Sequence, residues 1–132
     1  MFQYTFKIYY EDTDSGGVVY YANYLKFIER ARTEMINELG FTLTTLLKDY
    51  DRLFLVKKIE CDYIESCKLE DRLNVQSRVL LLKNASFELE QNILKQNNFI
   101  FRSKILMVCV NSRGAPCKIP SELHSLMKNK DG

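Results

Sequence analysis

One stretch of the chain has the period of a helix, and this limits the folds that the chain can adopt. Between Ala22 and Leu39, apolar residues recur at steps of three and four positions, and Gly40 follows as a terminator. The spacing predicts one amphipathic helix of about 18 residues, roughly 27 Å long at 1.5 Å per residue. The predicted apolar stripe consists of Tyr24, Phe27, Ile28, Ala31, Met35 and Leu39.

Most of the remaining chain alternates between apolar and polar residues, which is the pattern of β-strands. We expect strands at residues 3–10, 55–63, 73–81, 87–93 and 100–110. Tight turns are expected at Lys83-Asn84 and Asn97-Asn98, and short helices at 43–48 and at 121–128, where Ser121 is the expected cap. In the second strand, the alternation places one set of residues on a common face, namely Leu55, Lys57, Ile59, Cys61 and Tyr63.

The order of these elements predicts an α+β fold. One strand precedes the long helix, and four antiparallel strands joined by hairpins follow it. The helix must bury its apolar stripe against a five-stranded antiparallel sheet. A chain of 132 residues fits a single domain over residues 1–132. Apolar residues left on the sheet, such as Val108 and Val110, favour a symmetric dimer.

Composition argues against several classes of protein. The net charge of +2, with no lysine or arginine run longer than two residues, does not favour nucleic-acid binding. The only histidine, His124, is expected on the surface of the last helix, and four cysteines without a C-x-x-C spacing supply a metal site poorly. We also expect no signal peptide and no membrane span, and therefore a cytoplasmic protein with reduced thiols.

The segment before the long helix brings together groups that can perform chemistry. Asp12 and Asp14 precede Gly16-Gly17, and the predicted helix begins soon afterwards. A helix N-terminus favours a nearby carboxylate, and its free N–H groups can stabilise the oxyanion of an attacked carbonyl. The aspartates could instead simply occupy a turn. A calcium loop is disfavoured, because its fifth and twelfth positions would be Gly16 and Asn23.

Residues 9–32 resemble the signature of hotdog-fold acyl-CoA thioesterases, specifically the 4-hydroxybenzoyl-CoA thioesterase and YbgC (Tol–Pal-associated) branch. The stretch reads YYEDTDSGGVVYYANYLKFIERAR. The resemblance implies that Asp14 is the catalytic carboxylate and that the backbone N–H of Tyr21 polarises the thioester carbonyl. It also implies that Gly17 and Val18 line the substrate's approach. Tyr21 replaces the histidine that is usual in YbgC-type proteins, which affects the expected substrate preference and pH profile more than the activity.

The resemblance also implies an assembly. Hotdog thioesterases wrap a curved sheet around the helix, dimerise by extending the sheet, and often form tetramers with active sites at the dimer interface. Coenzyme A would then be held by both subunits, as part of the substrate and not as a cofactor. We expect Lys57, Lys83 and Ser86 to contact it, although each could equally be an ordinary solvated side chain.

These observations predict an acyl-CoA thioesterase that releases a free acid and coenzyme A. Asp14 would act as general base or as nucleophile, and the sequence leaves both roles open. The alternative is a non-catalytic adaptor that binds acyl-CoA or an acyl carrier protein and is linked to envelope lipid metabolism. The acyl group is not specified. Glu29 and Arg32 are expected to form an ion pair along the helix.

Overall fold

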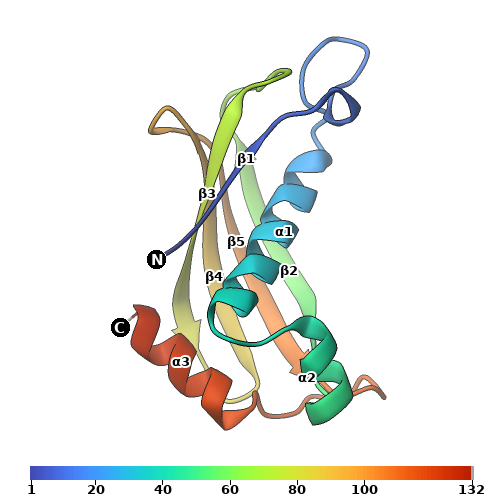
Figure 1. Ribbon diagram of the computed structural model, residues 1–132, viewed down its shortest axis with the longest axis vertical. Helices are drawn as coiled ribbons and strands as arrows, with labels where there is room; N and C mark the ends of the chain where they lie inside the picture. Colours follow the sequence, from blue (N-terminus) through green and yellow to red (C-terminus); the bar gives the residue numbers. More distant parts are fainter. Residues whose placement is uncertain (132) are drawn as a thin grey trace.

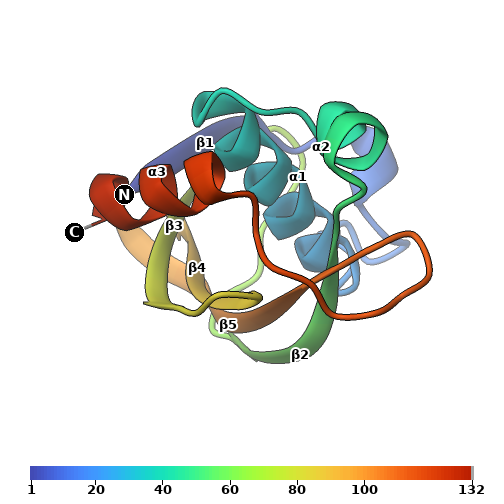
Figure 2. The ribbon, with the colours of Figure 1, turned by 90° about the horizontal axis from the view of Figure 1, so that it is seen from below.

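A five-stranded antiparallel sheet curves around one long helix in the computed structural model, which describes residues 1–131 (Figures 1 and 2). The strands are β1 (Phe2–Lys7), β2 (Leu53–Tyr63), β3 (Arg72–Leu82), β4 (Ser86–Lys95) and β5 (Asn98–Val110). The helices are α1 (Asn23–Glu38), α2 (Leu43–Tyr50), α3 (Ser121–Asp131) and a short 3₁₀ turn, η1 (Tyr10–Asp12). The predicted α+β architecture is confirmed.

Helix α1 differs from the predicted helix by one residue at each end. Its buried face contains the predicted stripe together with Asn23 and Ile36. The helix ends in a Schellman motif: Gly40 has φ +94°, its N–H donates to the carbonyl of Asn37, and the N–H of Phe41 donates to the carbonyl of Ile36. Figure 2 shows the sheet curving around α1, which buries the apolar face of the helix in the core.

The order of the strands corrects one prediction. The sheet order is β1-β3-β4-β5-β2, so β2 and β3 lie on different sides of the sheet and do not form a hairpin. The link over residues 64–71 carries the chain from one side of the sheet to the other. The N–H of Ile64 donates to the carbonyl of Ile100, and the N–H of Glu70 donates to the carbonyl of Ile8. β1 pairs along β3 and thereby occupies the edge that a β2–β3 hairpin would have used.

A β-bulge corrects the predicted faces of β2. Val56 pairs with Met107 and Lys58 pairs with Leu106, which leaves Lys57 as an extra residue. An extra residue shifts the alternation of side chains by one position. Leu55, opposite Val108, therefore faces away from α1, whereas Ile59 packs against the core. The two residues do not share a face as the simple alternation predicted.

Three smaller predictions, about a turn, a helix cap and an exposed valine, are also corrected. The second turn has positive φ at Gln96 and Asn97, one residue earlier than expected. Ser121 is the first residue of α3 instead of its cap. Val110 is buried within its own chain by a bridge to Pro116, and so is not available to a dimer interface.

His124 lies on α3 as expected but is not a surface residue. Its ring is half-buried, and its Nε2 atom is inaccessible and has no hydrogen-bond partner among the described residues. The four cysteines are free, with Cys67 and Cys109 buried.

A buried polar network joins α1 to the middle of the sheet. The amide of Gln91, which is 0% exposed, donates to the carbonyl of Ile28 at 3.0 Å and to the hydroxyl of Ser77 at 2.9 Å. Its Oε1 atom accepts a hydrogen bond from Nη1 of Arg32 at 3.0 Å. The predicted direct pair between Glu29 and Arg32 is absent, because the guanidinium group turns to Gln91.

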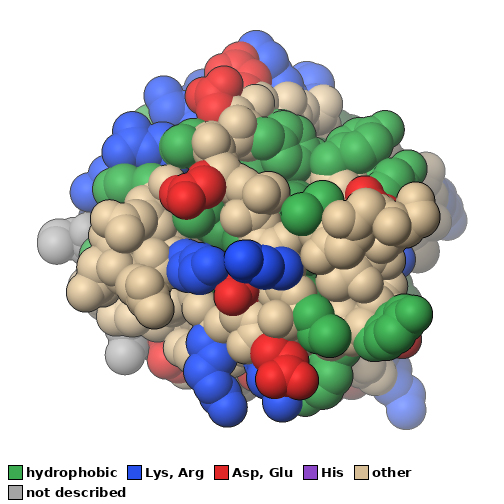
Figure 3. Space-filling view, turned by 90° about the horizontal axis from the view of Figure 1, so that it is seen from above, with side chains coloured by type: hydrophobic (Ala, Val, Ile, Leu, Met, Phe, Trp, Pro, Cys, Tyr) green, Lys and Arg blue, Asp and Glu red, His purple; other side chains and the backbone are tan. Residues whose placement is uncertain are grey.

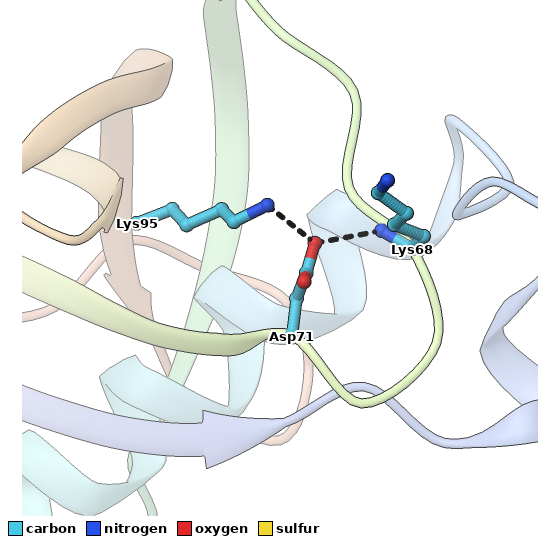
Figure 4. A network of polar contacts seen from close by, with 3 residues as sticks. All are labelled: Lys68, Asp71 and Lys95. Carbon is cyan, nitrogen blue, oxygen red and sulfur yellow. Dashed lines mark hydrogen bonds and ion pairs between the residues drawn. The ribbon is translucent and has the colours of Figure 1, made fainter.

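The upper end of the molecule, seen in Figure 3, contains the loop before α1 and the link over residues 64–71. Asp71 holds this link: its Oδ2 atom accepts hydrogen bonds from the backbone N–H of Lys68 and from Nζ of Lys95, each at 2.9 Å (Figure 4). Burial alone would raise the pKa of Asp71, but the two donors outweigh burial and lower the pKa.

Replacing Gln91 with leucine should destabilise the protein strongly. The variant removes the acceptor of Arg32 and the donor to Ser77, so we expect the free energy of unfolding to fall by about 2 kcal/mol or more. Urea denaturation measures the change. Gln76→Leu, half-exposed on the outer side of β3, should cost less than about 0.5 kcal/mol. Equal losses in the two variants would contradict the importance of the network.

The Asp71 contacts should make stability depend on pH. Because the folded pKa of Asp71 is lowered, its contribution is present above its unfolded pKa and is lost as the pH falls through the folded value. Asp71→Asn should therefore cost about 1 kcal/mol at pH 7, and the difference from wild type should shrink at pH values below about 4. Urea denaturation across this range, with the exposed Asp49→Asn as control, is the measurement. A difference that does not change with pH would contradict this role.

Candidate active site in the loop before the central helix

The two aspartates of the loop have different surroundings. Asp12 is buried, its Oδ2 atom accepts from the N–H of Tyr9 at 2.9 Å, and its carbonyl accepts from the side chain of Asn23 at 2.9 Å. The N–H of Tyr20 donates to the same carbonyl at 3.0 Å. The carbonyl of Asp12 thus holds the loop on the start of α1, while its buried carboxylate closes the turn on Tyr9 and is not available to a substrate.

Asp14 is exposed at the tip of the same loop. One carboxylate oxygen, Oδ1, accepts a hydrogen bond from the N–H of Gly16 at 2.8 Å, while the other has no partner in the described part of the chain. A Cβ atom at Gly16 would lie 3.2 Å from that Oδ1 atom, and Gly17 has φ +83°. The glycines therefore permit the turn that fixes Asp14 and leaves one of its oxygens accessible.

Asp14, Gly17 and Val18 lie together, as predicted. The N–H of Asp14 donates to the carbonyl of Val18 at 2.8 Å, and the N–H of Gly17 donates to the carbonyl of Asp14 at 3.1 Å. Val18 also forms a bridge with Lys68, in the link held by Asp71. The sequence analysis missed this contact between Val18 and Lys68, because it joins segments far apart in the chain.

The backbone N–H of Tyr21 is available at the start of the helix. α1 begins at Asn23, two residues later than Tyr21, and the intervening turn is closed by the N–H of Asn23 on the carbonyl of Tyr20. Within residues 1–131, the N–H of Tyr21 donates no hydrogen bond. Tyr21 directly precedes the cap residue Ala22, so its N–H lies beside the helix N-terminus, where the partial positive charge of the helix favours a carbonyl oxygen or an oxyanion.

One small hairpin carries both Asp14 and Tyr21. Its arms are joined by the bridge between Thr13 and Val19 and by the N–H of Tyr20 on Asp12. The hairpin that carries these two groups lies at the upper end of the molecule (Figure 1). Among the side chains that the structure describes, no three of His, Cys, Asp or Glu converge as ligands of a metal ion would.

Aromatic side chains surround this hairpin, and the sequence analysis did not select most of them. The hydroxyl of Tyr63 donates to the carbonyl of Tyr21 at 3.0 Å, which ties the end of β2 to the site. The ring of Tyr21 lies 4.9 Å from that of Tyr20 and 6.2 Å from that of Tyr63. Beneath them, burial and the Cys67 thiol raise the pKa of Tyr24. The sequence signal that could have identified Tyr63 is its position on the face of β2 that packs toward the helix.

The predicted coenzyme A contacts lie away from the hairpin in the same chain. Lys57 is at the bulge of β2, six positions before Tyr63, which corresponds to roughly 20 Å along a strand. Lys83 and Ser86 are together in the β3–β4 turn, where the N–H of Lys83 donates to the carbonyl of Ser86 at 2.8 Å. Figure 1 shows this turn at the end of the sheet opposite to the loop before α1. One chain therefore does not bring these three residues to Asp14.

No helix of the described chain is long and apolar enough to cross a membrane.

Comparisons with known proteins agree with the fold and show the family. The family model described as the thioesterase-like superfamily matches residues 9–126. The acyl-CoA thioesterase YbgC of Haemophilus influenzae is 39% identical over 123 residues, covering 92% of this chain and 90% of that protein. The acyl-CoA thioester hydrolase YbgC of Escherichia coli O6:H1 is 36% identical over 112 residues, covering 84% and 83%.

The solved structure of a gentisyl-coenzyme A thioesterase superposes on this chain with a TM-score of 0.87 and 30% identity, covering 95% of this chain and 98% of that one. Such neighbours have the hotdog fold, which confirms the predicted fold. The loop that carries Asp14, strands β2 to β5 and helices α1 and α2 lie inside the residues that the family model matches, whereas β1 and the end of α3 lie outside them. The chain belongs to the thioesterase-like superfamily, together with the YbgC acyl-CoA thioesterases.

Proposed function

We propose that the protein hydrolyses acyl-CoA thioesters, with Asp14 as the reacting carboxylate and the backbone N–H of Tyr21 as the oxyanion donor. One observation carries the proposal: the same hairpin presents a carboxylate oxygen without a partner and an N–H without an acceptor. This second carboxylate oxygen of Asp14 and the N–H of Tyr21 make no hydrogen bond among the described residues, so both remain available to a substrate. The YbgC relatives supply the substrate class, an acyl-CoA.

The chemistry follows from this placement. The thioester carbonyl would lie at the Tyr21 N–H, where the start of α1 favours the negative charge that develops on oxygen. Asp14 would either remove a proton from an attacking water or attack the carbonyl carbon itself. In both routes the carbon–sulfur bond breaks, coenzyme A leaves as a thiolate that takes up a proton, and water supplies the new oxygen of the acid.

Tyr21 contributes through its backbone in this mechanism. An N–H donor is present whichever side chain the residue carries, so the absence of the histidine typical of YbgC-type proteins does not remove the oxyanion donor. The phenol ring of Tyr21 and its neighbour Tyr20 lie at the surface beside the hairpin. These rings are positioned to influence which acyl groups enter.

A second chain would complete the coenzyme A site. β2 is an edge strand of 11 residues that pairs only with β5, and Leu55 and Val56 on it are 50% and 43% exposed. Long exposed edges of this kind pair readily with another strand. A two-fold axis near the middle of β2 runs the partner strand in the opposite direction. It keeps Lys57 near the axis, and it places the end of one sheet that carries Lys83 and Ser86 on the same side as the Tyr63 end of the other. We propose a homodimer of this kind, alone or paired into a tetramer.

Asp14→Asn should nearly abolish turnover while leaving the fold intact. The amide oxygen can still accept the hydrogen bond of Gly16, but it is neither a base nor a nucleophile, so we expect a loss of about 10²-fold to 10⁴-fold. The measurement is release of free thiol from a panel that runs from short aliphatic acyl-CoAs through palmitoyl-CoA to benzoyl- and 4-hydroxybenzoyl-CoA.

Asp12→Asn is the matched control, because its carboxylate only accepts a backbone hydrogen bond. It should keep most of the activity. An active Asp14→Asn variant would remove Asp14 from its assigned role. Saturable binding of acyl-CoA by the wild type without turnover would favour the non-catalytic adaptor.

Variants that prevent β2 pairing should lose activity as they become monomeric. Leu55→Glu places one carboxylate from each chain near the proposed two-fold axis, and these like charges disfavour association. Light scattering should show a monomer, and thiol release should fall together with affinity for coenzyme A. The control is Leu81→Glu on β3, which is 49% exposed and lies away from β2. A monomer with full activity would rule out a shared site.

A further inference from the structure

Arg32 is a partly buried cation without a carboxylate partner. Among the described residues its one hydrogen bond is from Nη1 to Oε1 of Gln91, a neutral amide. Burial lowers the pKa of the guanidinium group, with Glu29 acting in the opposite direction, and arginine nevertheless stays protonated in proteins. A charge taken out of water normally has a counter-charge, and this one has none within ion-pair distance among the described side chains.

The guanidinium group borders a cavity of about 210 Å³ between α1, α2 and the β2 side of the sheet. Most of the lining is apolar and includes Met35, Phe54, Phe87 and Met107. Arg32 is the only cationic residue in the lining. The cavity therefore combines an apolar wall, suited to a hydrocarbon chain, with one donor group suited to a carboxylate.

Gln91 fixes the orientation of Arg32. Both donor contacts of its amide are made, to Ile28 and to Ser77, so its Oε1 atom must face the guanidinium group. An arginine that is held in this way loses little conformational entropy on binding a ligand, and its remaining N–H groups can donate to a carboxylate in a bidentate manner.

Glu29 is the charged residue that opposes such a ligand. It also lines the cavity, and its carboxylate accepts a hydrogen bond from the hydroxyl of Thr33 at 3.2 Å. Glu29 is exposed to solvent, whereas Arg32 is half-buried. Water screens an exposed charge more effectively than a buried one, so the field inside the cavity is dominated by Arg32.

We propose that this cavity receives the far end of the acyl group and that Arg32 binds a carboxylate carried there. The substrates would then include mono-thioesters of dicarboxylic acids with coenzyme A. This inference rests on the proposed function, since it names the acyl group of the same reaction. From Asn23 to Arg32 the helix extends about 14 Å, so a chain of intermediate length is required to reach from the Tyr21 N–H.

The test compares carboxylate-ended with methyl-ended thioesters of equal chain length. Succinyl-, adipoyl-, suberoyl- and sebacoyl-CoA are each paired with the corresponding fatty acyl-CoA, and kcat/KM is measured for wild type and Arg32→Met. Wild type should prefer the carboxylate-ended member of at least one pair. Arg32→Met should lower kcat/KM for that member about tenfold or more and leave the methyl-ended one within about twofold.

A second pair of variants leaves the Arg32–Gln91 contact untouched, in case Arg32→Met folds poorly. Leu43, the first residue of α2, is 44% exposed and borders the cavity. Leu43→Asp should reduce the preference for the carboxylate-ended substrate by repulsion, and Leu43→Asn should not. Glu29→Gln should increase that preference, because it removes the charge that opposes a carboxylate in the cavity.

Binding separates a failure of this inference from a failure of the proposed function. Calorimetry on the Asp14→Asn variant reports affinity for each thioester of a pair without turnover. The inference is supported if the carboxylate-ended thioester binds more tightly than its methyl-ended partner and if adding Arg32→Met abolishes this difference. That result would stand even if the wild type hydrolyses nothing. A preference for the methyl-ended thioester at every length, or equal losses for both members in Arg32→Met, would overturn it.

Discussion

Burial of α1 inside the curved sheet is the constraint on which the other features depend. One face of the helix is buried along its length, and the hydrogen bonds of Gln91 to Ile28 and Arg32 also join the helix to the sheet. Because these contacts hold the helix in place, its N-terminus is fixed relative to the end of the sheet. The loop before it can then be tied down by Asp12 and Asn23, which leaves Asp14 and the Tyr21 N–H in defined positions.

This division of labour explains why the loop carries two aspartates. Asp12 gives its carboxylate to a backbone N–H and its carbonyl to Asn23, and so supplies order. Asp14 is kept at the tip by a single hydrogen bond to Gly16, and so retains an oxygen for chemistry. A similar division is present under the helix, where Gln91 satisfies the backbone and leaves the charge of Arg32 facing a cavity.

The sequence predicted the parts of the molecule that depend on local pattern. The limits of α1, the antiparallel strands and the grouping of Asp14 with Gly17 and Val18 all follow from residues close together in the chain. The sequence analysis failed where distant segments decide the outcome. The β2–β3 hairpin was wrong because β1 pairs with β3, and the faces of β2 were wrong because a bulge at Lys57 changes the alternation. Arg32 was predicted to pair with Glu29, because its actual partner, Gln91, lies 59 residues away along the chain and local spacing does not reveal it.

The central claim is that the Tyr21 N–H and Asp14 act on the same carbonyl group. The most direct measurement is the amide NMR spectrum of the Asp14→Asn variant, recorded with and without a non-hydrolysable acyl-CoA analogue that keeps the carbonyl. A new hydrogen bond should move the Tyr21 amide proton downfield, and the shift should be absent with coenzyme A alone. A Tyr21 signal that does not move while the analogue binds elsewhere on the protein would contradict the account.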